Sequence, residues 1–346
     1  MPTPLLHTSA AVLEFDRLRE IVRGCCQCEL GQQAVDSLAP TTDAAWIERQ
    51  QQFTAEVRAF FQAGGRFDFG GLVDPRQFVL RARIAGATLE TTELRDAILL
   101  VDRAAEWRET AAHPPQAMRD PSINWSGASF RLPGRETPWP AVEELSSVIE
   151  DFTPLLRYFA NKLSPDGTLD DNASPALATI RREIEKQRRS IQNSLRGYLR
   201  RLSEGDALQD ELVTIRGDRF VIPVKTEQKR RVQGVVHGAS SSGQTVFVEP
   251  LETIEQNNEL VRLLEDEQRE IHRILVEMTA RLGQQSEAIL IAVDVLRELE
   301  LQFAKARFAE QYACTRVKLL APDSANSLVL LDARHPVMER NLRSRG

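Results

Sequence analysis

The sequence predicts a mainly α-helical protein with a helical core, two long antiparallel helices and a small antiparallel β clamp at the tip of the helix pair. Charged residues make up 27% of the 346 residues and aromatic residues only 6%, a balance that suits long exposed helices better than a compact β fold. Apolar residues recur with a narrow, coiled-coil-like spacing in two separated runs. The segment between these runs is rich in β-branched and turn residues, which favour strands and hairpins.

The first half of the chain, residues 1–173, is predicted to form the helical core. Thr42 or Asp43 can cap one of its helices, and Gly64 followed by Gly65 ends that helix. The proline-rich stretch 111–141 has no apolar period and is interpreted as a connector. The helical segments expected from apolar spacing are 11–35, 42–63, 77–84, 91–110 and 141–162.

Two long lever helices are predicted, an ascending one over 174–210 and a descending one over 251–313. Ser174 as the cap and Pro175 at the first helical position give a strong start signal. Two long helices separated by a short insert most simply pack antiparallel. The apolar stripe of the first comprises Ile180, Ile184, Ile191, Leu195, Tyr198 and Leu202.

The insert 211–250 is predicted to be the β clamp. The run "ELVTIRGDRFVIPVK" has two β-rich halves around a Gly217-Asp218 turn signal. In "TVFVE", Thr245, Phe247 and Glu249 should face one way and the valines between them the other. Together with "VQGVVHG", this run predicts a second hairpin, in which Gly238 and Gly243 would permit the turn geometry.

Charge is distributed unevenly along the chain, whose formal net charge is −6. The segment from Arg181 to Arg231 carries 14 basic and 8 acidic residues, so the remainder of the chain is strongly acidic. One interpretation is that the basic clamp contacts phosphates. The other is that the basic stretch and the acidic stretch 249–270 neutralise each other along the paired helices.

The candidate nucleic-acid contacts come from this clamp. His237 could touch a phosphate or a base, or could simply be a polar residue at a strand end. Ser241, in "GASSSG", would let the backbone approach a phosphate without steric bulk. The basic candidates are Arg216, Arg219, Lys225, Lys229, Arg230 and Arg231.

Several other functions find no support in the sequence. No GxxxxGK[ST] motif occurs, so no nucleotide loop of that type is present. The cysteines, three of them at 25–28 and one at 314, have no second ligand cluster and are expected to be free thiols. No catalytic or metal constellation can be defended, and no cofactor is expected in this chain. The start of the chain lacks a signal-peptide pattern and the apolar runs are short, so a soluble cytoplasmic protein without membrane contact is expected.

A series of motifs nevertheless resembles one family. The motifs "LEFDRLRE", "LAPTTD", "GGLVDPR", "VTIRGDRFVIPVK", "GVVHGASSSGQTVFVEPLETIEQNNEL", "FAKARFA" and "ARHPVME" follow one another in order from residue 11 to residue 339. In this order they resemble the bacterial MutS-type paralogue family, MutS-two. The most specific part of the resemblance is the clamp segment 233–260.

The resemblance implies a helical core, a lever and a clamp, followed in that family by an ABC-type ATPase domain that dimerises and binds ATP and Mg²⁺. Residues 314–346 would be the start of that domain, and Arg334 and His335 would lie near its nucleotide. A nuclease domain often follows. The sequence would then be the core, lever and clamp fragment, without enzymatic activity of its own. The mismatch-reading domain of the related mismatch-repair proteins has no counterpart before the core.

Three functions stay open at this point. The resemblance implies binding to duplex, branched or recombination DNA. In some members of the family it implies action on stalled ribosomes, so the clamp could instead bind RNA or a ribosomal protein. The third possibility is a coiled-coil dimerisation module that uses Ile180, Ile184 and Ile191 and no nucleic acid.

Overall fold

The computed structural model describes residues 10–119, 137–164, 166–203, 213–319 and 329–344. The chain forms two compact units: the first unit comprises Met1–Tyr158 with Thr279–Gly346, and the second unit comprises Phe159–Met278. Helices dominate and the strands form one small antiparallel sheet, so the predicted mainly α fold class is confirmed.

The first unit is built around the helix α11 (Ser286–Gln311), which contacts several other helices of this unit. Its core is aromatic. The Phe303 ring of α11 packs edge-on against Phe69 and Trp107, with ring centroids 5.0 and 5.6 Å apart. The remaining elements are α2 (Phe15–Arg23), α3 (Glu29–Asp36), α4 (Ala44–Gln62), α5 (Arg76–Arg81), α6 (Thr91–Ala112), η1 (Gln116–Arg119), α7 (Pro140–Ser146), α8 (Thr153–Phe159) and α12 (Pro336–Arg343).

The predicted limits of α4 are confirmed in detail. The Asp43 carboxylate accepts a hydrogen bond from the Trp46 backbone N–H at 3.0 Å and so caps the first turn. At the other end, Gly64 has a φ of +82°, a conformation that glycine adopts without strain.

Three predicted helical runs are each divided in the structure. The run 11–35 is interrupted between Gly24 and Cys28, and the run 141–162 is interrupted after Ser147. The predicted descending helix 251–313 is broken at Gln285, which separates α10 (Ile254–Gln284) from α11. The second interruption buries Ile149 and Phe152 at 3% and 1% exposure, so packing against the core overrides helical continuity there.

A buried carboxylate helps to place α7. Glu56 is fully buried in α4 and accepts hydrogen bonds from the backbone N–H groups of Ala141 (3.0 Å) and Val142 (2.9 Å) in the first turn of α7. Burial raises the pKa of Glu56 to about 7, although these hydrogen bonds and one from Gln52 oppose the shift.

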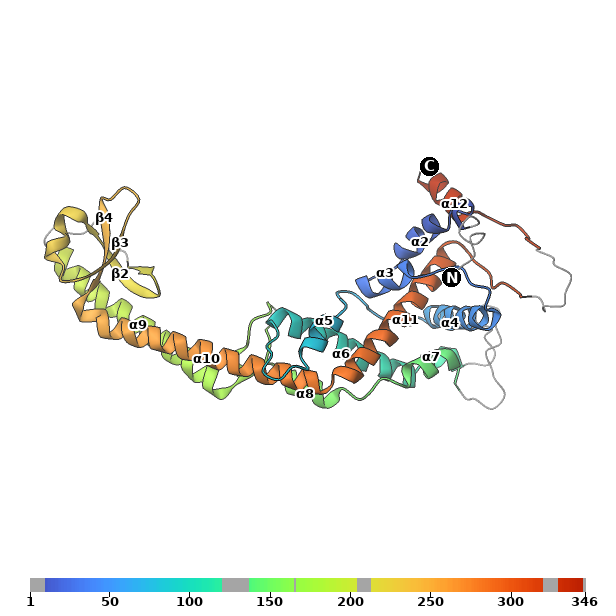
Figure 1. The fold of residues 1–346 in the computed structure, drawn as a ribbon, viewed down its shortest axis with the longest axis horizontal. Helices are drawn as coiled ribbons and strands as arrows, with labels where there is room; N and C mark the ends of the chain where they lie inside the picture. Colours follow the sequence, from blue (N-terminus) through green and yellow to red (C-terminus); the bar gives the residue numbers. More distant parts are fainter. Residues whose placement is uncertain (1–9, 120–136, 165, 204–212, 320–328, 345–346) are drawn as a thin grey trace. The chain divides into compact units, whose positions relative to one another are not determined.

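In the second unit, α9 (Pro175–Ser203) and α10 lie side by side and antiparallel (Figure 1). The Arg181 guanidinium bonds to Glu267 at 2.8 Å, and Ser174 donates to Glu270 at 2.6 Å. The Ser174 hydroxyl also accepts from the Leu177 N–H at 3.0 Å, which confirms the predicted cap. Two short 3₁₀ helices, η3 (Asp171–Ala173) and η5 (Leu251–Thr253), precede α9 and α10.

The insert forms a four-stranded antiparallel sheet in the order β1-β2-β4-β3. Both predicted hairpins, β1–β2 and β3–β4, are confirmed, and β2 pairs with β4 to join them. Gly217 and Asp218 both have positive φ, as the type I′ turn of a tight hairpin requires. The strands are β1 (Thr214–Arg216), β2 (Arg219–Lys225), β3 (Gly234–Ala239) and β4 (Thr245–Pro250), and η4 (Thr226–Arg231) links β2 to β3.

One face of the sheet packs on the helix pair. Phe220, Ile222 and Val224 of β2 join Val246 and Val248 of β4 in a common core with α9 and α10. The predicted stripe of α9 supplies its other wall: Ile184, Ile191 and Leu195 are 3%, 0% and 0% exposed. These side chains are therefore used within the chain, which leaves them unavailable for the dimerisation surface considered above.

An asparagine completes the hydrogen bonds of β2. The β2–β4 register places Phe220 opposite Pro250, which has no N–H to donate. The Asn257 side chain of α10 takes that place, because its Oδ1 accepts from the Phe220 N–H and its Nδ2 donates to the Phe220 carbonyl, both at 3.0 Å.

The remaining domain limits stay predictions. Residues 204–210 of the predicted ascending helix and part of 314–346 lie outside the described residues. Among the described residues of 314–346, Val329, Leu330 and Leu331 form no strand and are exposed.

Candidate nucleic-acid interface

The sheet of the second unit has an outer face opposite the core. The alternation of β2 and β4 places Arg219 and Lys225 on this face together with Phe247 and Glu249. The division of "TVFVE" between the two faces is therefore as predicted. Arg216 on β1 lies opposite Arg219 and shares the face.

A buried carboxylate organises one end of the outer face. The Glu249 side chain is only 2% exposed and binds residues of three elements. Its Oε1 accepts from Arg219 at 2.8 Å and from Asn257 at 2.9 Å, while its Oε2 lies 2.6 Å from His237 Nε2.

This arrangement changes the role of two predicted contacts. Arg219 also donates to Asn258 at 2.6 Å, so its guanidinium is engaged within the protein. His237 lies within β3, not at its end, and its imidazole is directed to Glu249. Neither side chain is free for a ligand, because both are bound to Glu249.

Arg216 is placed differently. Its guanidinium carbon lies 4.3 Å from the centre of the Phe247 ring, in a cation–π arrangement. No described carboxylate lies within ion-pair distance of it, and the residue is exposed. Phe247 itself is half-buried.

The connection η4 carries the densest basic group. Lys229 and Arg230 are exposed and have no hydrogen bond or ion pair with any described residue. Arg231, in contrast, does interact with another residue. Lys225, at the end of β2, is half-buried and also has no described ion-pair partner.

The serine turn lies beside the start of η4. Thr226 donates from its N–H to the Gln244 carbonyl at 2.9 Å and from its hydroxyl to the Gly243 carbonyl at 2.6 Å. Gly243 has a φ of +69° at this turn, as predicted. Gly238, with a φ of +132°, lies instead within β3, where the pairing with β4 shifts register. Ser241 is exposed at this turn.

Ion pairs of α9 with η5 and α10 support the charge-neutralisation interpretation in part. Arg181 pairs with Glu267, and Arg201 bonds to Glu252 at 2.6 Å. Lys186, Arg189 and Arg196 on α9 have no such pair with a described residue. The acidic stretch therefore neutralises some arginines of α9, while Lys229 and Arg230 of η4 and Arg216 of β1 have no ion pair with a described residue.

Arg334 and His335 belong to the first unit. Arg334 donates to the Tyr312 carbonyl at 2.5 Å and lies 3.4 Å from Glu339, and exposed His335 precedes the first turn of α12. Their expected place near a nucleotide stays a prediction.

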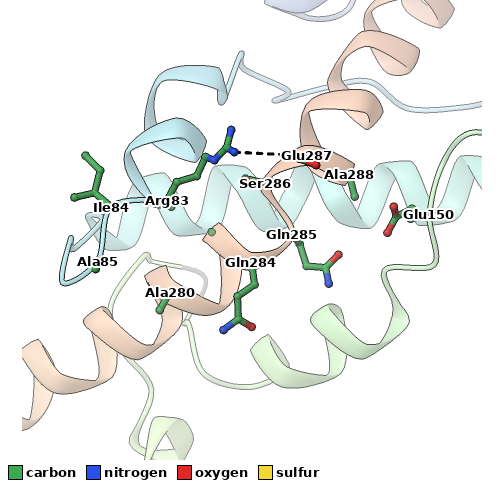
Figure 2. A pocket seen from close by; sticks show the side chains of 12 residues that line it. Arg83, Ile84, Ala85, Glu150, Ala280, Gln284, Gln285, Ser286, Glu287 and Ala288 are labelled. Carbon is green, nitrogen blue, oxygen red and sulfur yellow. Dashed lines mark hydrogen bonds and ion pairs between the residues drawn. The ribbon is translucent and has the colours of Figure 1, made fainter.

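The first unit also contains a pocket of about 690 Å³ where α10 gives way to α11. Figure 2 shows its polar lining, including Gln284, Gln285 and the Arg83–Glu287 ion pair at 3.4 Å. At Gly283 the helix approaches the backbone of Ala82 so closely that a Cβ would lie 2.1 Å from the Ala82 oxygen. The sequence predicts one continuous helix here, so it does not predict this recess.

Within the described ranges, no group of three or more histidine, cysteine or acidic side chains is arranged to hold a metal ion. Over the same ranges, no helix has the length and apolar character needed to cross a bilayer.

Two important residues of the outer face were missed at the sequence level. From the sequence, Phe247 and Glu249 have a predicted direction but no predicted role, and Glu249 also belongs to the acidic stretch 249–270. The strand alternation of "TVFVE" predicts that the two residues share a face, but their partners depend on the β2–β4–β3 register, which local sequence does not fix.

The fold and site define a class of protein: a mainly helical chain in which a small basic β sheet is inserted between two long paired helices. No protein-family model matches the chain. Among curated proteins, the chain is 31% identical over 343 residues to "Endonuclease MutS2" of Geobacillus sp. (strain WCH70), which covers 99% of the chain and 40% of that protein.

Two further proteins of the same name are similar. The protein of Thermomicrobium roseum is 32% identical over 337 residues, and that of Ruminiclostridium cellulolyticum is 31% identical over 328 residues; each alignment covers 95% of the chain. The chain is therefore a homologue of the bacterial MutS2 proteins. It spans about 40% of the length of these relatives.

Proposed function

We propose that the sheet and η4 form a clamp that binds the phosphate backbone of duplex or branched DNA. The observation that carries this proposal is that four cations of the insert have no described ion-pair partner. They are Arg216, Lys225, Lys229 and Arg230. Some arginines of α9 and α10, such as Arg181 and Arg262, are by contrast held by carboxylates, whereas Lys186, Arg189 and Arg196 of α9 have no carboxylate partner among the described residues. Cations kept free of internal partners are available to replace counterions on a phosphate backbone.

The relatives support the same choice. Their name, "Endonuclease MutS2", describes an activity on nucleic acid. By the resemblance to the MutS-two family, the clamp would serve a longer DNA-dependent ATPase that acts on branched or recombination DNA. ATP and Mg²⁺ would bind in the ATPase domain of such a protein, which would act as a homodimer.

The proposal is tested by measuring anisotropy of a labelled four-way DNA junction bound to the 346-residue chain, over a salt series. Each phosphate contact contributes about −0.9 to the slope of log K against log salt concentration. The double variant Lys229→Glu/Arg230→Glu should weaken binding strongly and make the slope shallower by about 2.

The matched control is Arg262→Glu/Arg273→Glu, which makes the same change in net charge at two arginines of α10 that already have carboxylate partners. This variant should bind DNA nearly as well as the wild type. Salt-independent binding, or equal effects of the two double variants, would contradict the proposal. Duplex RNA and ribosomes in parallel assays would show whether either is bound more tightly than DNA.

A further inference from the structure

The centre of the outer face carries an aromatic side chain that packing does not explain. The four strands contain two phenylalanines. Phe220 is 4% exposed and belongs to the core with the helix pair. Phe247 lies on the opposite face of the sheet, opposite Pro223 of β2, and remains half-buried. A large apolar ring at an open face is more typical of a binding surface than of a core.

Arg216 covers this ring without being held by a carboxylate. Its guanidinium carbon lies over the ring, 4.3 Å from the ring centre, a position that suits stacking of this planar cation on Phe247. Arg216 is exposed, and its other face is therefore open to a ligand. Arg219, which lies directly opposite it, is by contrast bound to both Glu249 and Asn258.

The charged residues around Arg216 indicate which kind of ligand this surface could bind. Lys225 shares the face and has no described ion-pair partner. Glu249 is the acidic residue of β2 and β4 on this face, and it is 1% exposed and already bound by Arg219 and His237. The accessible part of this face therefore presents the planar guanidinium of Arg216, with the positive charge of Lys225 on the same face. A matching ligand offers a flat π system joined to an anion, which describes a nucleotide.

We propose that the Arg216–Phe247 stack, defined by these two residues, receives the base of an unpaired nucleotide. The base stacks on the open face of the Arg216 guanidinium, and its phosphate lies among the neighbouring cations. Bases inside a duplex are stacked on each other and cannot present a face to this surface. The stack therefore gives the clamp a preference for gaps, single strands and branch points. This inference rests on the proposed function, since it assigns a specificity to the same surface.

The test compares two labelled DNAs of equal length, a fully paired duplex and a duplex with a short single-stranded gap. The gapped DNA carries fewer phosphates, so phosphate contacts alone would favour the fully paired duplex. A 2-aminopurine base in the gap reports stacking through quenching of its fluorescence. Base stacking on protein side chains corresponds to roughly 5- to 100-fold in affinity. The wild-type 346-residue chain should favour the gapped DNA by a factor in that range and should quench the 2-aminopurine signal.

Two variants remove the stack in different ways. Phe247→Leu removes the ring, and Arg216→Lys keeps the charge but removes the planar group. Both should reduce the ratio of the two affinities to within about twofold of unity and abolish the quenching, since either change removes the stacked base contact. Ile215→Ala is the matched control: Ile215 is 54% exposed, lies next to Arg216 in β1 and faces the other way. It should keep the preference. Circular dichroism checks that each variant is folded.

The possible outcomes separate this inference from the proposed function. Salt-dependent binding with equal affinity for duplex and gapped DNA would overturn the base-stacking inference, but it would agree with the proposed function of the clamp in DNA binding. Retention of the preference by Arg216→Lys or Phe247→Leu would overturn it as well. Absence of binding to either DNA would overturn both proposals. A gapped DNA–RNA arm of the same length distinguishes RNA from DNA as the source of the unpaired base.

Discussion

The carboxylate of Glu249 joins three structural elements, because its partners Arg219, His237 and Asn257 come from β2, β3 and α10. A buried carboxylate of this kind stabilises the fold only while its partners remain, since an unpaired buried charge or donor is costly. Glu249, which the sequence places in the acidic stretch 249–270, is thus a buried polar centre that joins the sheet to α10.

We predict that Glu249→Ala lowers the free energy of unfolding by about 3 kcal/mol, the cost typical of breaking a buried charge cluster. The control Glu252→Ala removes a carboxylate whose partner Arg201 is, like Glu252 itself, more than half exposed, and should change stability by less than about 1 kcal/mol. Urea denaturation followed by circular dichroism measures both. Equal effects of the two variants would show that Glu249 has no special role.

Glu56 is the residue from which a pH dependence is expected. Burial raises its pKa to about 7, above the value it has in an unfolded chain. Its contribution to stability is therefore fully present below the unfolded pKa, near 4.5, and is lost as pH rises through about 7.

The variant Glu56→Gln cannot ionise and should remove this dependence. Between pH 5 and pH 8, the free energy of unfolding of the wild type should fall relative to that of the variant by up to about 3 kcal/mol. Urea denaturation at several pH values measures the difference. Glu144→Gln, at an exposed residue paired with Arg49, is the control and should follow the wild type. Parallel curves for Glu56→Gln and the wild type would contradict the expectation.

Two glycines within helices illustrate how an element depends on its surroundings. In α9, no atom lies within 4 Å of a Cβ placed on Gly197, whereas in α10 a Cβ on Gly283 would meet the Ala82 backbone. Alanine is favoured over glycine in a helix by about 1 kcal/mol when nothing else changes.

We therefore predict opposite effects for the same substitution. Gly197→Ala should raise the free energy of unfolding by about 0.5–1 kcal/mol through helix propensity alone. Gly283→Ala should lower it by about 1–3 kcal/mol, because the methyl group would force α10 away from Ala82. Thermal or urea denaturation of the two variants decides the matter. If Gly283→Ala raised the free energy of unfolding instead, the close contact between Gly283 and Ala82 would not restrict position 283 to glycine.

The sequence predicts elements well where their signals are local. The Asp43 and Ser174 caps and the Gly217-Asp218 turn are all confirmed, because each depends on residues within a few positions. The interruption at Gln285 was missed, since the apolar spacing of α10 and α11 continues across it. Just before the interruption, Gly283 lies against Ala82, about 200 residues away in sequence, and periodicity cannot reveal such a contact.

At the scale of the molecule, the two units have separate hydrophobic cores and different spectroscopic reporters. All four tryptophans, at positions 46, 107, 125 and 139, belong to the first unit, where Trp107 and Trp139 are fully buried. The second unit contains none and is largely helical. Tryptophan fluorescence therefore follows the first unit, while far-ultraviolet circular dichroism follows both.

We predict that the urea transitions recorded by these two probes do not coincide, because units with separate cores unfold with different midpoints. The variant Glu249→Ala should shift part of the circular dichroism transition and leave the fluorescence transition unchanged. Coincident transitions in the wild type, together with a fluorescence shift in Glu249→Ala, would show instead that the whole chain unfolds as one cooperative unit.

The general class of the molecule could be predicted from its sequence, and its binding surface only in part. Periodicity and turn signals specified a helical protein with an inserted sheet. The net charge of the insert identified candidate cations but could not distinguish Arg219, which Glu249 holds, from Arg216, which stacks on a ring. That distinction depends on strand register, which emerges only from the assembled sheet.

The amide of Asn257 has a consequence for how the second unit assembles. It bonds both to the N–H of Phe220 and to its carbonyl, for which Pro250 has no N–H to donate, so β2 is completed by a helix that follows it in the chain. Until the first turns of α10 dock, the Phe220 amide has no partner and its proton exchanges with solvent. Exchange of this one proton thus reports formation of the helix pair and of the sheet together. The insert is expected to fold cooperatively with the helices that flank it, and not as a hairpin pair formed in advance.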